Sequence, residues 1–141
     1  MSRYLVDNSV LQRLPRSSEV QEAVTAILDA EHELCCCSLT LDEFAYSARS
    51  AAEHGEGSRR LRTSFLYLPA SPRTDQAVIN IRGALWEAGQ GRAAGVIDVA
   101  IAAAAVSFDA AVLHYDSDFD HIVGVFPQLS AQWVVPRGSI D

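Results

Sequence analysis

Short uncharged apolar segments alternate with helical segments along this chain, and this alternation constrains the fold more than any other feature. Three such segments are Tyr4–Val6, Leu34–Ser38 and Ala111–Tyr115, and a fourth is Trp133–Val135. Strands without charges are typical of parallel sheets that helices cover on both faces. The sequence therefore predicts an α/β protein, a three-layer α/β/α sandwich around a mostly parallel central sheet.

The segments between these strands carry helical signals. Glu19–Leu28 has the apolar spacing of an amphipathic helix. Thr40–Glu43 matches a capping box, which predicts a helix that has Glu43 in its first turn and runs toward Gly55. Ser58–Leu68 is expected to be a further helix. Gly95–Phe108 is rich in alanine, so we expect this helix to approach the sheet closely and to be central.

Length and composition indicate one domain that spans residues 1–141. The chain has 141 residues, of which 49% are hydrophobic, enough to bury a core. No apolar run approaches the roughly 20 residues of a membrane span. The N-terminal segment reaches Asp7 after six residues, which leaves no apolar region for a signal peptide. We therefore expect a cytoplasmic protein.

The cysteines and the basic residues exclude several classes of protein. Cys35, Cys36 and Cys37 are adjacent, so they predict small apolar side chains in a buried strand rather than a disulfide framework or a zinc site. Acidic residues outnumber basic ones by 18 to 11, and the net charge of −7 disfavours a module that binds nucleic acid through basic side chains. All basic residues are arginine, which excludes mechanisms that need an active-site lysine.

Acidic residues are placed where parallel strands end and where the following helices begin. Asp7 closes the first strand, Asp116 closes the third, and Asp118 follows two residues later. Glu43 and Asp98 are expected in the first turns of two helices. These positions share one edge of a parallel sheet, so we expect the carboxylates to converge.

Converging carboxylates raise each other's pKa, and a bound divalent cation is an economical way to offset their repulsion. Ligation by oxygen alone indicates Mg²⁺ or Mn²⁺ rather than zinc. Such an ion polarises a phosphate oxygen and activates water for in-line attack. Each acid alone has a simpler interpretation, such as a helix cap or a turn, so the hypothesis depends on the joint pattern.

Four motifs resemble those of PIN-domain ribonucleases, and most of all the VapC-like toxins of type II toxin–antitoxin pairs. They are Tyr4–Ser9, Glu43, Ile97–Ala103 and Leu113–Phe119. The resemblance extends from Tyr4 to about Phe126. It implies an Mg²⁺- or Mn²⁺-dependent endoribonuclease that leaves 5′-phosphate and 3′-hydroxyl ends. It also implies a homodimer and a cognate antitoxin that holds the toxin inactive.

The resemblance implies roles for individual residues. The catalytic acids would be Asp7, Glu43, Asp98 and Asp116, and the metal ligands Asp7, Asp98, Asp116 and Asp118. Asp118 could replace or assist Asp116, because the last motif of the family is its most variable. Ser9 matches a small polar residue beside the first acid, whereas Asn8 stands where many members have Thr or Ser.

Other functions remain open from the sequence alone. A phosphatase of another α/β family is disfavoured because the first strand lacks an Asp-x-Asp pattern and the chain lacks lysine. A catalytically inactive PIN-like module that binds a partner protein is the main alternative. His114 lies beside the acidic edge, where a packed or solvated role is expected. Arg59, Arg60 and Arg62 could grip phosphates, although a solvated helix face is the simpler interpretation.

Overall fold

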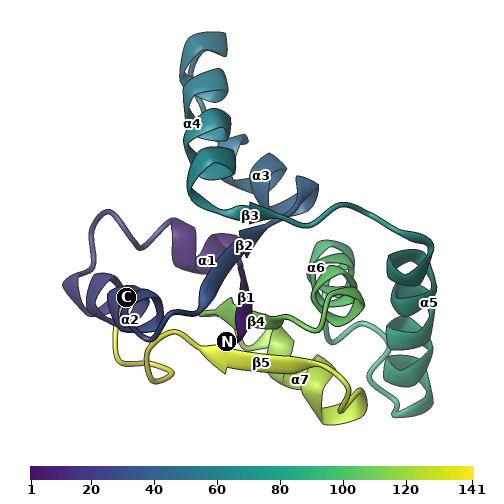
Figure 1. The fold of residues 1–141 in the computed structure, drawn as a ribbon. Helices are drawn as coiled ribbons and strands as arrows, with labels where there is room; N and C mark the ends of the chain where they lie inside the picture. The colour runs from purple at the N-terminus through teal and green to yellow at the C-terminus, as the bar shows by residue number, and fades with distance from the viewer.

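A five-stranded sheet, parallel at every pairing, forms the centre of the computed structural model, which describes residues 1–141 (Figure 1). The strand order is β3-β2-β1-β4-β5. The strands are β1 (Arg3–Val6), β2 (Glu33–Cys36), β3 (Leu66–Tyr67), β4 (Ala111–His114) and β5 (Ser130–Trp133). The predicted α/β class with a parallel central sheet is confirmed.

Seven helices connect these strands, and α4 projects away from the sheet at the top of Figure 1. Ser17 caps the second of these helices, Ser18–Asp29, by accepting a hydrogen bond from the backbone N–H of Val20. The helices are α1 (Asn8–Leu11), α2 (Ser18–Asp29), α3 (Ser38–Ala45), α4 (Ala51–Ser64), α5 (Pro72–Glu87), α6 (Val96–Ser107) and α7 (Asp118–Val125).

Successive residues of each strand face opposite sides of the sheet, so the core has two halves. Leu5 and Cys35 pack in the half formed with α5, α6 and α7, whereas Val6 and Cys36 pack in the half formed with α1 and α2. All three cysteines are buried free thiols, as predicted. No helix is both long and apolar enough to cross a membrane.

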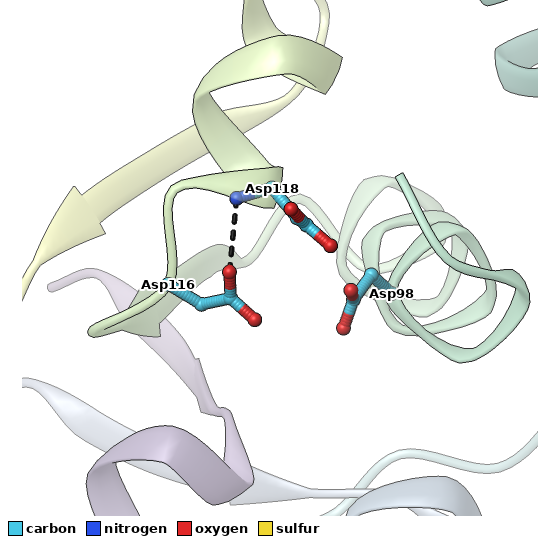
Figure 2. Close-up of side chains that lie close together, drawn as sticks. All are labelled: Asp98, Asp116 and Asp118. Atoms are coloured by element: carbon cyan, nitrogen blue, oxygen red, sulfur yellow. Dashed lines mark hydrogen bonds between the residues drawn. The ribbon is translucent and has the colours of Figure 1, made fainter. Parts of the chain in front are cut away.

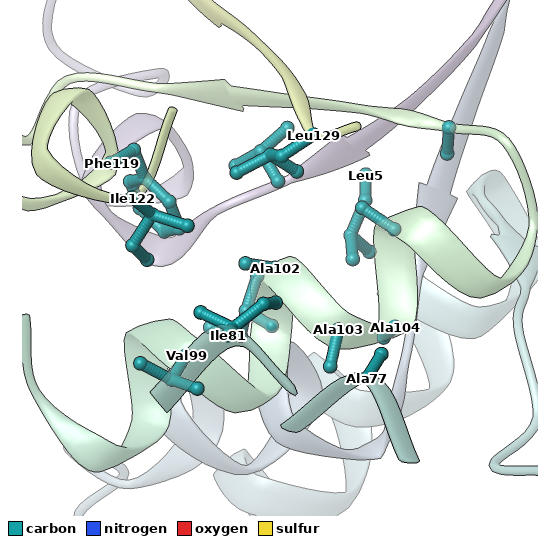
Figure 3. Packing of buried hydrophobic residues seen from close by; sticks show 14 of the residues in the cluster. Leu5, Ala77, Ile81, Val99, Ala102, Ala103, Ala104, Phe119, Ile122 and Leu129 are labelled. Atoms are coloured by element: carbon teal, nitrogen blue, oxygen red, sulfur yellow. The ribbon is translucent and has the colours of Figure 1, made fainter. Parts of the chain in front are cut away.

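The alanine-rich helix α6 lies deep in the larger half of the core. Figure 3 shows Leu5 and Leu129 on one side of α6, and Ala77 and Ile81 of α5 on the other. Its alanines at positions 102, 103 and 105 are fully buried. Small side chains let the backbone approach both neighbours closely, which confirms the expected central position of this helix and fixes the place of its N-terminus.

Several predicted element boundaries are wrong. The helix predicted to run from Thr40 toward Gly55 is two helices, because α3 ends at Ala45 and Ser50 caps a new helix, α4. Helix α4 takes in much of Ser58–Leu68, and the rest of that segment is the strand β3, which pairs with β2. The last strand ends at Trp133 instead of beginning there.

Candidate active site

The structure places the predicted acids around the carboxyl-terminal edge of the sheet. Asp7 follows β1 and Asp116 follows β4, and these two strands are direct neighbours. Asp98 lies in the first turn of α6, and Asp118 is the first residue of α7. The backbone N–H of Asp7 donates to the carbonyl of Leu113 at 2.9 Å, which ties the end of β1 to the end of β4.

Three of these carboxylates form one close group, which we call the acidic trio: Asp98, Asp116 and Asp118. One oxygen from each lies within 4.8 Å of the others, and all three residues are partly buried. Figure 2 shows the side chains of Asp98 and Asp118 near each other, with Asp116 across from them. The backbone N–H of Asp118 donates to Asp116 Oδ1 at 3.0 Å, which fixes the turn between β4 and α7.

The trio is electrostatically unfavourable when all its members are ionised. Burial, a hydrogen bond with Asp118 and the charges of Asp116, Asp7 and Asp118 together raise the pKa of Asp98 to about 8. A proton or a cation must therefore reside in the group near neutral pH. Closely spaced oxygen ligands without histidine or cysteine are the donor set of a hard divalent ion, so these residues fit Mg²⁺ or Mn²⁺.

Asp7 lies next to the trio and is 4% exposed. Its Oδ2 caps α1 by accepting from the backbone N–H of Ser9 at 3.0 Å and from Ser9 Oγ at 2.6 Å. Burial raises the pKa of Asp7, the bonds from Ser9 oppose this, and the charge of Asp116 adds to the rise. Asp7 is therefore held in one orientation, with its charge coupled to Asp116.

Ser9 connects two strand ends through its hydroxyl group. Besides donating to Asp7, Ser9 Oγ accepts the backbone N–H of Tyr115 at 2.9 Å. Because Tyr115 directly precedes Asp116, this hydroxyl fixes the spacing between the loops that carry Asp7 and Asp116. The sequence marked Ser9 as a supporting residue, and the structure adds its contact with Tyr115.

Glu43 lies in the second turn of α3, not in its first, because the helix begins at Ser38 rather than near Thr40. The N-terminus of α3 therefore does not stabilise this carboxylate. Glu43 Oε1 is buried and has no hydrogen-bond partner. Burial, followed by the charges of Asp7, Asp116 and Asp42, raises the pKa of Glu43. Glu43 thus shares the electrostatic environment of the acids but lies outside the trio.

His114 is packed rather than solvated, and it also contacts the site. It is completely buried between the rings of Phe119 and Trp133. Its Nδ1 accepts the backbone N–H of Asp116 at 3.2 Å. Burial lowers the pKa of His114, so the ring is neutral with its proton on Nε2. The sequence offered no signal for this contact, because the bond runs through the backbone of Asp116.

The loop before α6 is held by Arg82, a residue that the sequence analysis did not select. Arg82 Nη1 donates to the carbonyls of Gly91 at 2.7 Å and Ala94 at 2.9 Å. Trp86 is 59% exposed and covers Gly91. These contacts fix the segment that leads into the first turn of α6, and therefore fix Asp98.

The basic cluster does not belong to the acidic group. Arg59, Arg60 and Arg62 are exposed on α4, where Arg62 lies over the ring of Tyr67 at 4.9 Å. None of them affects the pKa of an acid at the site. These positions support the interpretation that the three arginines lie on a solvent-exposed face of the helix.

Comparisons with known proteins agree with this arrangement. The family model of the PIN domain matches residues 4–125. Ribonuclease VapC51 of Mycobacterium tuberculosis is 34% identical over 99% of this chain and 98% of its own length. Ribonuclease VapC21 of the same species is 30% identical over 98% of both chains.

Solved structures share the fold at lower sequence identity. VapBC-1 from nontypeable Haemophilus influenzae superposes with a TM-score of 0.76 at 19% identity, covering 94% of this chain and 98% of that chain. DNA-bound VapBC from Salmonella typhimurium superposes with a TM-score of 0.75 at 18% identity, covering 96% of this chain and all of that chain. The chain therefore belongs to the PIN-domain family, and within it to the VapC-like group.

Proposed function

We propose that this protein is a metal-dependent endoribonuclease, the toxin of a toxin–antitoxin pair, which hydrolyses RNA to 5′-phosphate and 3′-hydroxyl ends. The observation that carries the proposal is the acidic trio, with the pKa of Asp98 raised to about 8. Such a group is costly to maintain in a folded protein unless a cation binds there. The relatives are named ribonucleases, which supports the same activity.

The acidic trio would hold Mg²⁺ or Mn²⁺, and Asp7 would complete the ligand set. A bound ion would polarise a phosphate oxygen and lower the pKa of water. Asp7 keeps one carboxylate oxygen bonded to Ser9, which leaves its other oxygen for the ion. The backbone bonds of His114 and Ser9 keep the Asp116 loop in place.

Glu43 is suited to act on water rather than on the ion. Its buried Oε1 has no partner, so it can accept a proton from a water molecule beside the scissile phosphate and orient that water. Its raised pKa makes it a better proton acceptor than an exposed glutamate. Glu43→Gln keeps the shape but cannot accept the proton, so it should lower kcat by about 10²–10⁴-fold, the usual contribution of a positioned acid or base.

The cognate antitoxin is the second expected partner. Two structures with this fold are described in these terms: VapBC-5 from Mycobacterium tuberculosis as a member of the VapBC family of toxin–antitoxin systems, and one from Klebsiella pneumoniae as a toxin–antitoxin complex. A cluster of carboxylates attracts an arginine of a partner protein through charge-assisted hydrogen bonds. A homodimer is the assembly that the family resemblance implies.

The test is cleavage of a mixed cellular RNA pool by the full chain free of antitoxin. Parallel reactions contain Mg²⁺, Mn²⁺ or EDTA. The variants are Asp98→Asn and, as a matched control, Asp75→Asn, because Asp75 is an exposed acid in the first turn of α5. We expect discrete fragments with either metal, none with EDTA, none with Asp98→Asn, and the wild-type pattern with Asp75→Asn.

A thermal-shift measurement with Mn²⁺ provides a readout that does not depend on cleavage. At a concentration 100 times the Kd, a ligand that binds only the folded state stabilises it by about 2.7 kcal/mol. We expect Mn²⁺ to raise the melting temperature of the wild type and not that of Asp98→Asn. Unaltered cleavage by Asp98→Asn would contradict the assignment. Absence of both cleavage and metal binding would leave a protein-binding module.

A further inference from the structure

A surface hollow adjoins the acidic edge, and apart from Glu43 its residues have no part in the function proposed above. Its volume is about 610 Å³, within the usual range of ligand sites. We call it the α1–α3 hollow, because most of its wall comes from α1, α3 and the residues that follow each. The residues that matter for the argument are Asn8, Asp42, Glu43, Tyr46 and Ile97.

Two of these residues place the hollow beside the proposed active site. Glu43 lines the hollow, and its pKa responds to the charges of Asp7 and Asp116. Ile97 directly precedes Asp98 in the first turn of α6. A group bound in the hollow would therefore lie beside the acids that are proposed to act on the scissile phosphate.

The charges of the wall decide which part of an RNA could enter. Asp42 and Glu43 are acidic, and no arginine or histidine lines the hollow. A phosphate group would be repelled there, whereas an uncharged nucleobase would not. The acidic residues of the wall therefore favour a nucleobase over the sugar–phosphate backbone of the RNA.

The side chains also suit a base by shape. Tyr46 is 88% exposed at the end of α3, so its ring is free to stack on a base, and Ile97, 41% exposed, offers an apolar contact. Single-stranded RNA is commonly recognised by stacking of splayed bases on aromatic rings together with hydrogen bonds to their edges.

The hydrogen-bonding groups of the wall favour a base whose edge presents hydrogen-bond donors. Asn8 Oδ1 is a buried acceptor without a partner, and the exposed Asp42 carboxylate adds two more acceptor oxygens. Guanine presents two adjacent donors, N1–H and the N2 amino group, that a carboxylate can accept together. Uracil presents one N–H between two carbonyl oxygens, which a carboxylate would repel.

We propose that the α1–α3 hollow is a nucleobase subsite that binds an unpaired guanine of the RNA substrate next to the scissile bond. Tyr46 stacks on the base, and the Asp42 carboxylate accepts from its Watson–Crick edge. This proposal rests on the ribonuclease function proposed above and specifies part of its substrate.

The first arm of the test measures binding without relying on cleavage. Four fluorescently labelled heptaribonucleotides, six uridines around a central G, A, C or U, are titrated with the full chain in Ca²⁺ and followed by anisotropy. We expect the G heptamer to bind at least fivefold more tightly than the U heptamer, since a bidentate pair discriminates by that much or more. Asp42→Asn should reduce this ratio below twofold, and Asp75→Asn should leave it unchanged.

Tyr46 is tested with two variants. Tyr46→Ala should weaken binding of all four heptamers by about fivefold or more, whereas Tyr46→Phe, which keeps the ring, should bind as the wild type does. Equal affinity of the wild type for G and U, or no measurable binding of any heptamer, overturns the proposal. A guanine preference that survives Asp42→Asn overturns the role of that residue and with it the proposal.

The second arm separates this proposal from the ribonuclease function. Fragments from a cellular RNA pool are end-mapped in Mn²⁺, and guanine should be enriched at one fixed distance from the cleavage sites. Cleavage without such enrichment removes the subsite and leaves the nuclease. Guanine-selective binding without any metal-dependent cleavage leaves the subsite and removes the nuclease. If Tyr46→Ala impairs only binding of the cognate antitoxin, the hollow is a protein-docking surface and the proposal is wrong.

Discussion

Asp98 shows how one residue links folding to metal binding. Its pKa of about 8, against an ordinary value of 3.8, means that the folded chain retains a proton that the unfolded chain releases. Its contribution to stability is therefore fully present below about pH 3.8 and is lost as the pH rises toward and through about 8. A bound cation would replace the proton and reverse this dependence.

Asp98→Asn removes the charge while keeping the shape of the side chain. In EDTA at pH 8, we expect the melting temperature of the variant to exceed that of the wild type by about 2–6 °C, the shift that roughly 1 kcal/mol produces in a chain of this size. The decline of wild-type stability between pH 4 and pH 8 should become shallower. Differential scanning calorimetry across this range measures both effects, and an unchanged pH profile would contradict the pKa of Asp98.

Ser9→Ala tests the hydroxyl that joins the loops after β1 and β4. The substitution leaves the backbone N–H of Tyr115 without its partner and removes the bond that lowers the pKa of Asp7. We expect a loss of about 1–3 kcal/mol in the free energy of unfolding. Urea denaturation at pH 7 measures it. Ser9→Thr keeps a hydroxyl and should recover most of the loss. Equal stability of Ser9→Ala and the wild type would show that the hydrogen bonds of the Ser9 hydroxyl do not stabilise the fold.

At the scale of elements, most of the site could be predicted from the sequence because strand ends are marked by acids. Asp7 and Asp116 follow uncharged strands, and Asp98 is the only charge in an alanine-rich segment. The environment of Glu43 was harder to predict. The sequence shows a capping box at Thr40–Glu43, but in the structure Cys37 is the N-cap and its backbone N–H donates to Thr40 Oγ1, so α3 begins at Ser38.

The two-residue strand β3 and the helix break before α4 were not predicted. Two residues are too few to show the alternation of a strand, and β3 is identified only by its pairing with Cys35 and Cys36. The break before α4 depends on Ser50, whose hydroxyl accepts from the backbone N–H of Glu53. Pairing with β2, which is distant in sequence, therefore identifies β3, whereas the start of α4 depends on a local cap.

The loop between α5 and α6 should depend on Arg82. Arg82→Met removes two hydrogen bonds to backbone carbonyls, so we expect a loss of about 1–3 kcal/mol and faster amide exchange over residues 91–98. Metal affinity should fall as well, because Asp98 follows this loop. Hydrogen-exchange mass spectrometry measures the first effect. Arg92→Met is the matched control, since Arg92 is exposed in the same loop and should change stability by less than about 0.5 kcal/mol.

At the scale of the whole molecule, the three adjacent cysteines report on global opening. Burial raises the pKa of Cys35 and of Cys36 to about 11, so their thiols stay protonated as well as inaccessible. Both lie on β2, which is paired on each side by β1 and β3. Their exposure therefore requires disruption of the sheet rather than local fraying.

Thiol labelling turns this arrangement into a measurement. We expect no labelling of the native chain by a maleimide at pH 7 within minutes, and three labels per chain in denaturing urea. Millimolar Mn²⁺ should slow the remaining native-state labelling of the wild type but not of Asp98→Asn, because the ion binds only the folded state. Mass spectrometry counts the labels. Rapid labelling of the native chain would show that the sheet opens locally.

The acidic trio is contributed entirely by the part of the chain after α5. A ribosome that has translated β1, β2 and β3 has already made three of the five strands of the sheet, yet the emerging polypeptide still lacks Asp98, Asp116 and Asp118. Under the proposed function, a nascent chain therefore gains no partial activity as it lengthens. Cleavage competence would arrive only once Asp118 has been made, so products truncated before α7 would not cleave the cell's own RNA.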